Sequence, residues 1–120
     1  MDIEGRKGET IGRYLDLATS EIKLTAANMA NIDTPGYKAV GMDFEAEMRQ
    51  AVGDVYKGNP GRAPRSVVVD GLIARPDGID VSMEREGLNM AEAQLKFRVG
   101  VTLLRAENQR VMDAIRADSK

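Results

Sequence analysis

The sequence contains no cysteine, no histidine and no tryptophan among its 120 residues. Disulfides and the usual cysteine or histidine ligands of metal sites are therefore excluded. The same absence removes the most frequent general base and the thiol nucleophile of enzyme active sites. A chain without cysteine suits a protein that crosses unfolded into an oxidising space, although this feature alone does not fix the compartment.

The chain also lacks an excess of either charge and any long apolar run. Lysine and arginine total 17 against 19 aspartate and glutamate, with the two signs mixed along the sequence. Nucleic-acid binders usually carry a basic excess or stripe, so we expect no nucleic-acid partner. No apolar run approaches the length of a membrane span. Residues 1–10 are polar, so no cleavable secretory signal is visible and export would need another route.

The first part of the chain carries an apolar stripe with alternating spacings of four and three. This spacing is typical of a helix that packs against another helix. We expect the helix to begin near Glu9 or Thr10 and to end before Pro35, because the residue before a proline avoids helical geometry. The stripe consists of Ile11, Leu15, Ala18, Ile22, Thr25, Met29 and Ile32.

A second long helix is predicted from about Val81 to Ile115. One of its stripes repeats every seven residues: Met83, Met90, Phe97, Leu104 and Val111. A second stripe beside it contains Leu88, Ala91, Leu95, Val99, Leu103 and Ala106. One helical partner cannot cover so wide an apolar surface, which predicts more than one neighbour. Gly87 and Gly100 weaken a straight helix, and close packing or mild bending would explain them.

These stripes lead to two residue assignments. The seam between the two helices is assigned to Ile11, Leu15, Ile22, Met29, Phe97, Leu104 and Val111. The candidate subunit interface is assigned to Leu88, Leu95, Val99 and Leu103. The predicted fold is mainly α, with two long terminal helices packed as an antiparallel, coiled-coil-like hairpin. Residues 1–38 and 78–120 form this terminal-helix domain, and residues 39–77 are the connecting segment.

The connecting segment is irregular and contains weaker signals. Residues 41–53 are compatible with a short helix, with Phe44, Met48 and Val52 on one side. The Gly, Asn, Pro and Arg residues in 57–64 indicate a mobile loop. Residues 66–74 are compatible with a small β-hairpin that turns at Asp70-Gly71.

The end of the first helix carries a distinctive turn motif. The sequence Thr34-Pro35-Gly36-Tyr37 predicts a type II turn, because proline fixes φ at the second position and glycine allows a positive φ at the third. Asn28 and Asn31 precede it, where short amides can bond the last helical carbonyls or tie down the following loop. The motif turn comprises Asn28, Asn31, Asp33, Thr34, Pro35, Gly36 and Tyr37.

Residues 27–31 (Ala-Asn-Met-Ala-Asn) followed by 33–38 (Asp-Thr-Pro-Gly-Tyr-Lys) closely resemble the N-terminal signature of flagellar axial proteins, the rod, hook and filament-linked family. The short chain, residues 37–39 and residues 42–44 (Met-Asp-Phe) narrow the resemblance to proximal rod subunits. The C-terminal half matches at 81–86, 89–91, Leu95, Phe97 and 103–104. Asp80 and Phe97 depart mildly from the usual Asn and Tyr, and residues 55–75 match nothing that can be carried over.

The resemblance implies a structural subunit of the proximal rod of the bacterial flagellar basal body. It implies export unfolded through the flagellar type III apparatus, without signal cleavage, and assembly in the periplasm through coiled-coil terminal helices. The implied partners are other rod subunits, the basal-body adaptor FliE and the membrane-ring protein. Such a subunit would transmit torque and continue the export channel. No cofactor, small-molecule substrate or enzymatic activity is implied.

Two other classes of protein share parts of this pattern. A coiled-coil adaptor or export chaperone of another assembly would show the same stripes, but it has no reason to carry both the motif turn and the residues 84–86 block. An enzyme would have to use carboxylate pairs such as Asp77 with Asp80 or Glu84 with Glu86, and capping and dipole roles explain these. The spacing of Asp33, Asp43 and Glu45 fits no metal-binding loop.

Overall fold

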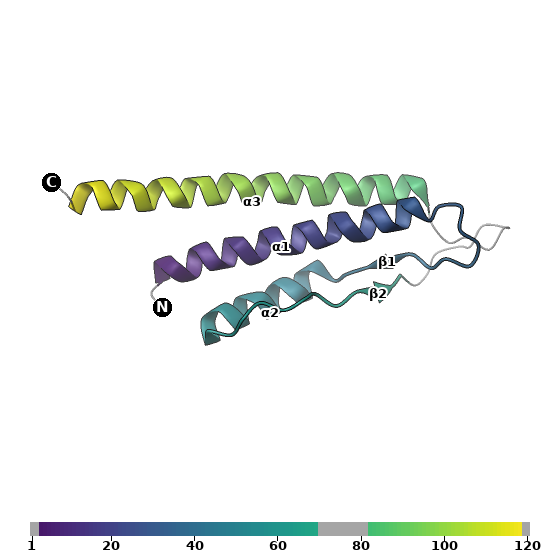
Figure 1. Cartoon of the computed structure of the whole chain (residues 1–120), viewed down its shortest axis with the longest axis horizontal. Helices are drawn as coiled ribbons and strands as arrows, with labels where there is room; N and C mark the ends of the chain where they lie inside the picture. Colours follow the sequence, from purple (N-terminus) through teal and green to yellow (C-terminus); the bar gives the residue numbers. More distant parts are fainter. Residues whose placement is uncertain (1–2, 70–81, 119–120) are drawn as a thin grey trace.

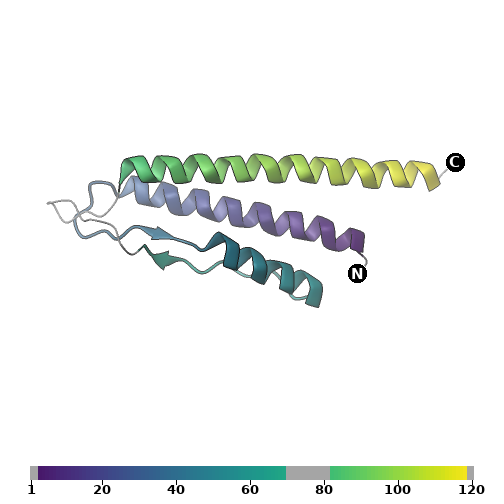
Figure 2. The same ribbon diagram turned by 180° about the vertical axis from the view of Figure 1, so that it is seen from behind.

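The computed structural model describes residues 3–69 and 82–118. Its elements are α1 (Ile3–Ala30), β1 (Val40–Gly41), α2 (Phe44–Lys57), β2 (Val67–Val68) and α3 (Met83–Asp118). The molecule is elongated, with principal extents of 69 × 25 × 17 Å. The two terminal helices run antiparallel, and α1 lies between α3 and a layer formed by α2 and the two strands (Figure 1, Figure 2). The predicted helical hairpin with a small β element is confirmed.

Helix α1 begins about two turns earlier than the stripe predicted. Its first turns, from Ile3, carry polar residues that find partners on both neighbouring layers. The Lys7 ammonium lies 3.4 Å from a Glu107 carboxylate oxygen on α3. The Arg6 guanidinium lies 5.1 Å from the ring centroid of Tyr56 on α2. Because polar contacts hold these turns, the hydrophobic pattern did not reveal them, and the predicted start near Glu9 was wrong.

The contact between α1 and α3 is centred on four α3 residues spaced seven apart. Glu86, Ala93, Gly100 and Glu107 are all buried, although two of them carry charge and two are small. A side chain at Gly100 would place its Cβ 2.6 Å from Leu15 Cδ2 and 3.1 Å from Tyr14 Cδ1. The absence of a side chain at Gly100 allows α1 of the same chain to pack directly against α3.

Two alanine substitutions on α3 are expected to change stability in opposite directions. Gly87→Ala meets open space and should stabilise the chain by up to about 1 kcal/mol through helix propensity. Gly100→Ala collides with Leu15 and Tyr14 and should destabilise it by about 1–2 kcal/mol. Urea unfolding followed by circular dichroism measures both. Two stabilising substitutions would show that α1 does not press on Gly100.

Glu107 anchors the N-terminal end of α1 to α3. Glu107 is only 5% exposed, and its carboxylate accepts a 2.6 Å hydrogen bond from Arg110 Nη2. The same carboxylate forms an ion pair with Lys7 of α1. The hydrogen bond from Arg110 is the main cause that holds the pKa of Glu107 below its ordinary value of 4.5; burial opposes it and Lys7 assists it. The charged form is therefore favoured in the folded state.

This lowered pKa predicts a pH-dependent contribution to stability. The contribution is fully present above the unfolded pKa of 4.5, and it is lost as the pH falls through the lower folded pKa. Glu107→Gln should therefore be less stable than the parent at pH 7, and the difference should shrink below pH 4.5. Thermal unfolding across this range measures the difference. A gap that does not change with pH would mean that the charge of Glu107 contributes nothing.

Helix α2 starts and ends with well-formed caps. The Asp43 side chain accepts a hydrogen bond from the Ala46 amide, and Gly58 closes the helix with a φ of 73°. The predicted apolar side is only partly covered, since Phe44, Met48 and Val52 are half-buried. Phe44 makes an edge-to-face contact with Tyr14 of α1, with ring centroids 5.5 Å apart. The buried face of α2 consists of Glu47, Ala51, Asp54 and Val55.

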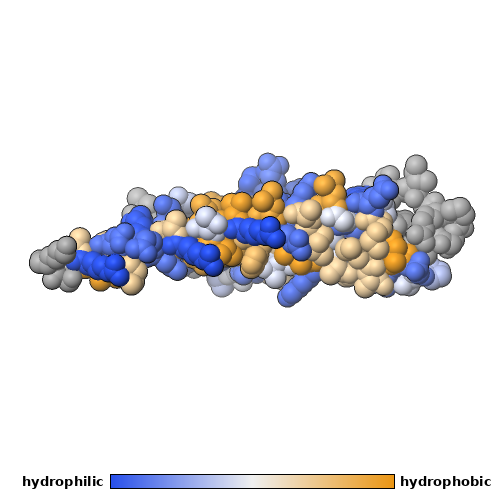
Figure 3. Space-filling view, turned by 90° about the horizontal axis from the view of Figure 1, so that it is seen from above, coloured by the Kyte–Doolittle hydropathy of each residue, from blue (hydrophilic) through white to orange (hydrophobic). Residues whose placement is uncertain are grey.

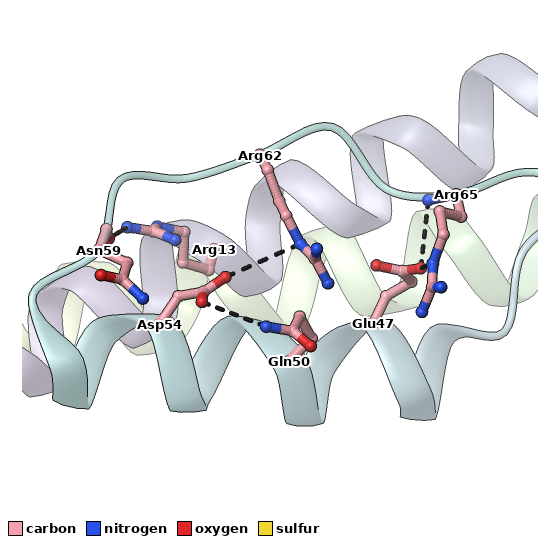
Figure 4. A network of polar contacts seen from close by, with 7 residues as sticks. All are labelled: Arg13, Glu47, Gln50, Asp54, Asn59, Arg62 and Arg65. Carbon is pink, nitrogen blue, oxygen red and sulfur yellow. Dashed lines mark hydrogen bonds and ion pairs between the residues drawn. The ribbon is translucent and has the colours of Figure 1, made fainter.

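Residues 57–64 were predicted to be a mobile loop. Lys57 is the last residue of α2, and residues 59–66 form an extended strap, outside any helix or strand, that runs back along α2 (Figure 4). Arg13 of α1 donates a 3.2 Å hydrogen bond to the Asn59 carbonyl. The strap is also tied to two buried carboxylates on α2. Arg62 lies 3.9 Å from Asp54, and Arg65 lies 3.5 Å from Glu47.

The two strands form a small antiparallel sheet. Val40 is opposite Val68, and Gly41 is opposite Val67. The sequence pattern had paired residues 66–69 with residues 72–74 through a local turn. Within the described residues β2 pairs with β1, more than twenty residues earlier. The predicted turn and second strand, residues 70–74, lie outside the described ranges. Within the described residues, no helix is long and apolar enough to cross a membrane.

Candidate functional site

The motif turn stands where α1 ends and the chain turns back toward β1 (Figure 1). The Tyr37 amide donates to the Thr34 carbonyl at 3.2 Å, and Gly36 has a φ of 78°. These are the hydrogen bond and the positive φ expected of the predicted type II turn. Asn31 closes the helix end: its amide donates to the Ala27 carbonyl, and its oxygen accepts from the Thr34 hydroxyl. Hydrogen bonds within the turn and at the end of α1 therefore fix this corner between α1 and β1.

Asn28 connects this corner to the sheet. Its Oδ1 accepts from the Val40 amide at 3.0 Å, and its Nδ2 donates to the Val40 carbonyl at 2.7 Å. The Tyr37 hydroxyl donates to the same Oδ1 at 3.1 Å. Asn28 is 2% exposed. Its side-chain amide thus bonds β1 in the manner of a neighbouring strand, which fixes the sheet against the end of α1.

A small apolar core lies beside the turn. Ala39 is completely buried and is packed by Ile32, Tyr37 and Val69. Pro35 and the exposed residues Asp33, Thr34 and Gly36 lie on the outside of the corner. The motif residues therefore divide into an anchor, formed by the buried Asn28 and the partly buried Tyr37, and an exposed bend. This arrangement holds the end of α1 against β1.

The second candidate feature is the open face of α3, defined by Leu88, Leu95, Val99 and Leu103. Leu88 and Leu95 are 61% and 63% exposed, and Val99 and Leu103 are also exposed. Figure 3 views the molecule from the α3 side and shows apolar side chains gathered over the middle of this face among charged ones. All four residues assigned to a subunit interface thus lie uncovered on one helix.

The residues assigned to the seam divide between covered and half-open positions. On α1, Ile11 is buried and Leu15, Ile22 and Met29 are partly buried. On α3, Leu104 is partly buried, while Phe97 and Val111 remain 39% and 40% exposed. The α3 residues flank the Glu86, Ala93, Gly100 and Glu107 centre and do not form it. Beyond Val111, Met112 and Ile115 are also exposed near the end of the helix.

Several residues that hold the site together were missed from the sequence. Lys96 on α3 lies 2.8 Å from Glu21 on α1 and 4.0 Å from the ring centroid of Phe44 on α2, so one side chain joins three helices. Glu47 and Asp54 bind the strap. The buried residues at the centre of α3 recur every seven positions, and this spacing was a signal in the sequence for the contact with α1. A search for apolar residues does not find it, because two of these residues are glutamates and one is glycine.

The structure describes some of the carboxylates that were considered for catalysis or metal binding. Glu86 is 2% exposed, and its Oε2 has no hydrogen-bond partner within the described residues. Asp43 caps α2. Asp77 and Asp80 lie outside the described residues. Within residues 3–69 and 82–118, no group of three or more acidic side chains is placed to hold a metal ion.

Curated proteins that are similar along most of their length give the family. No protein-family model matches the chain. The flagellar basal body rod protein FlgB of Salmonella typhimurium is 32% identical over 119 residues, which cover 84% of this chain and 86% of that protein. FlgB of Proteus mirabilis is 28% identical, covering 82% and 85% of the two chains. FlgB of Cereibacter sphaeroides is 29% identical, covering 87% and 89%.

The first of these similarities exceeds 30% identity and covers more than four fifths of both chains. The resemblance found from the residues and the similarity of whole chains thus lead to the same group of proteins. The chain belongs to the FlgB family of flagellar basal body rod proteins.

Proposed function

We propose that the chain is a structural subunit of the proximal rod and that it polymerises through its N- and C-terminal helices. In this proposal the open face of α3 contacts adjacent subunits. One observation carries the proposal: four large aliphatic side chains of a single helix, Leu88, Leu95, Val99 and Leu103, are 43–63% exposed. A row of this kind on one face usually marks a protein contact.

The energetics favour association once neighbours are available. Covering apolar surface contributes about 25 cal/mol per Å², so each of the four side chains adds to binding when another helix covers it. The regular spacing of the residues suits the ridges and grooves of a second helix. In contrast, the centre of the α1–α3 contact contains Glu86 and Glu107, so the more apolar side of α3 faces away from its own chain.

The proposed mechanical role follows from the length and bracing of the helices. α3 has 36 residues and therefore extends about 54 Å as one continuous helix. The antiparallel α1 and the Lys96–Glu21 pair brace it from one side, and the α2 layer packs on the far side of α1. A braced helix of this length resists bending. We infer that such subunits, packed side by side, transmit torque and continue the export channel.

The proposal includes partners and location. The chain would be exported through the flagellar type III apparatus without a cleavable signal and would assemble in the periplasmic part of the basal body. Its partners would be other rod subunits, the adaptor FliE and the membrane-ring protein. The family membership supports these assignments, since its curated members are basal body rod proteins.

Deletion of the gene in its source bacterium tests the proposal. We expect non-motile cells whose isolated basal bodies keep membrane rings but lack a rod in electron micrographs. The intact gene should restore the rod, whereas a version lacking residues 34–37 should not, because the corner between α1 and β1 would be lost. Motile cells with complete rods would contradict the proposal and favour an adaptor role in another assembly.

A further inference from the structure

Two arginines on α3 are not paired within their own chain. The α3 residues that pack against α1 recur every seven positions and include Gly100 and Glu107. A helix turns by about 100° per residue, so the positions two residues earlier lie on the opposite side of α3. Arg98 and Arg105 occupy these positions, and both are exposed. Neither side chain forms an ion pair or a hydrogen bond with another residue that the structure describes.

Two carboxylates on α1 have the same spacing. Lys7 and Tyr14 lie against α3. Glu9 and Asp16 follow them by two residues and therefore point away from α3. The strap beside α2 meets α1 at Arg13, on a neighbouring side of the helix, and both carboxylates stay exposed. Neither carboxylate pairs with any residue in 3–69 or 82–118. This side of α1 is thus acidic and open.

We propose that Arg98 and Arg105 of one copy pair with Asp16 and Glu9, respectively, of a second copy. Charge selects this occupant, because two guanidinium groups seven residues apart match two carboxylates seven residues apart. In this contact α3 of one copy packs antiparallel to α1 of the next. A Cβ at Gly12, between the two carboxylates, would meet open space, so α1 leaves room for the approach. The inference rests on the proposed function and names the surface that the neighbour presents to α3.

The register within the chain determines how the copies stand. Lys7 pairs with Glu107 across the α1–α3 contact. Glu9 lies two residues after Lys7 and Arg105 lies two before Glu107, so Glu9 and Arg105 stand level along the molecule. A second copy that is level with the first and points the same way therefore brings these two residues together. Since the two surfaces differ, the contact can repeat from copy to copy around a ring or a helix.

The open face of α3 lies beside the proposed pairs. Leu95 precedes Arg98 by about one helical turn, and Leu88 precedes Leu95 by about two. In the antiparallel register these leucines come close to the level of Ser20 and Ala27 of the second copy, whose small side chains allow the helices to approach. Covering the leucines supplies most of the affinity. Exposed ion pairs add little affinity, and their main effect is to fix register and orientation.

Charge reversals in the deletion strain test the pairing. Arg98→Glu and Asp16→Arg each place like charges opposite each other in every contact, so each should slow spreading in soft agar at least about twofold. The double variant with both substitutions restores opposite charges and should spread nearly as fast as the parent. Arg105→Glu with Glu9→Arg repeats the test at the second pair, and it serves if a variant of the first pair alters the fold.

The mismatched control combines Arg98→Glu with Glu9→Arg. It carries the same kinds of substitution as the matched double variant, but the new charges meet Asp16 and Arg105, which have the same sign. It should spread no faster than Arg98→Glu alone. Because all the substituted side chains are exposed, circular dichroism and urea unfolding of the purified variants should match the parent.

Normal spreading by Arg98→Glu and Asp16→Arg, or a matched double variant no faster than the single variants, would overturn the inference. Rescue by the mismatched control would also overturn it, because the two helices would then run parallel. If Leu95→Asp still abolishes swimming in these cases, α3 contacts a different surface and the proposed function stands. A motile deletion strain with complete rods would instead contradict the proposed function, and this inference with it.

Discussion

Leu95→Asp is expected to abolish swimming while the subunit still folds and is produced at normal levels. Leu95 is 63% exposed, so its replacement removes little packing within the chain, and stability should change by no more than about 0.5 kcal/mol. In a polymer that covers this face, the substitution would bury a carboxylate without a partner, which is far more costly. Val99→Asp should act in the same way. Motility in soft agar and unfolding of the purified subunit measure the two effects.

The matched control is Gln94→Asp. Gln94 is exposed, precedes Leu95 on the same helix and lies off the Leu88–Leu103 stripe, so it adds the same charge in a different direction. This variant should swim nearly as well as the parent. Normal swimming by both the Leu95→Asp and Val99→Asp strains would exclude a subunit contact at the open face of α3.

Asn28→Ala should cause the largest loss of stability among substitutions at the motif turn. The change removes three hydrogen bonds, two to the Val40 backbone and one from the Tyr37 hydroxyl, at a site that is almost fully buried. At about 1 kcal/mol each, with a further cost for groups left unpaired, the loss is about 3–4 kcal/mol. Urea unfolding of the purified subunit measures it.

Asn31→Ala provides the comparison for this prediction. The Asn31 amide bonds the Ala27 carbonyl and the Thr34 hydroxyl, both at an exposed helix end, so its loss should cost only about 1 kcal/mol. Asn28→Asp keeps the shape and the acceptor but loses the donor to the Val40 carbonyl, so it should resemble Asn28→Ala. Equal stabilities of the Asn28→Ala and Asn31→Ala variants would show that Asn28 is not the link between α1 and β1.

The helix stop and the turn were readable from the sequence because their signals are local. Proline and glycine impose particular backbone angles wherever they occur, and Gly36 adopts the positive φ that the type II turn requires. Asn28 and Asn31 were assigned to the helix end for the same reason. Which neighbour Asn28 binds depends on the return of the chain to Val40, and no local signal encodes that.

The sequence predicted that α1 packs against α3, but it did not predict which α3 residues lie at the centre of the contact. Apolar stripes indicated that α3 packs on both sides, and the exposed Leu88 and Leu95 agree with the assignment of one stripe away from α1. The buried centre contains Gly100, which allows close approach, and Glu107, which is neutralised by Lys7 and Arg110. Hydrophobic periodicity does not detect contacts of this kind.

The middle of the chain was hardest to predict because its structure depends on distant partners. Val67 and Val68 were recognised as strand-forming, yet their partner β1 has only two residues and includes Gly41. The strap has a loop-like composition, and its contacts with α2 come from Arg62 and Arg65, which pair with carboxylates there. Contacts between separate segments decide both features, and no alternation or spacing within a segment reveals them.

Protection of a thiol at position 95 tests the central claim most directly. Leu95→Cys should react with a maleimide rapidly in the free subunit, where the side chain is open, and slowly in basal bodies isolated from motile cells. Ala93→Cys, at a position buried in the chain itself, should be protected in both states and react only after unfolding. A thiol at position 95 that reacts as fast in assembled basal bodies as in the free subunit would contradict the account, because the open face of α3 would then have no neighbour.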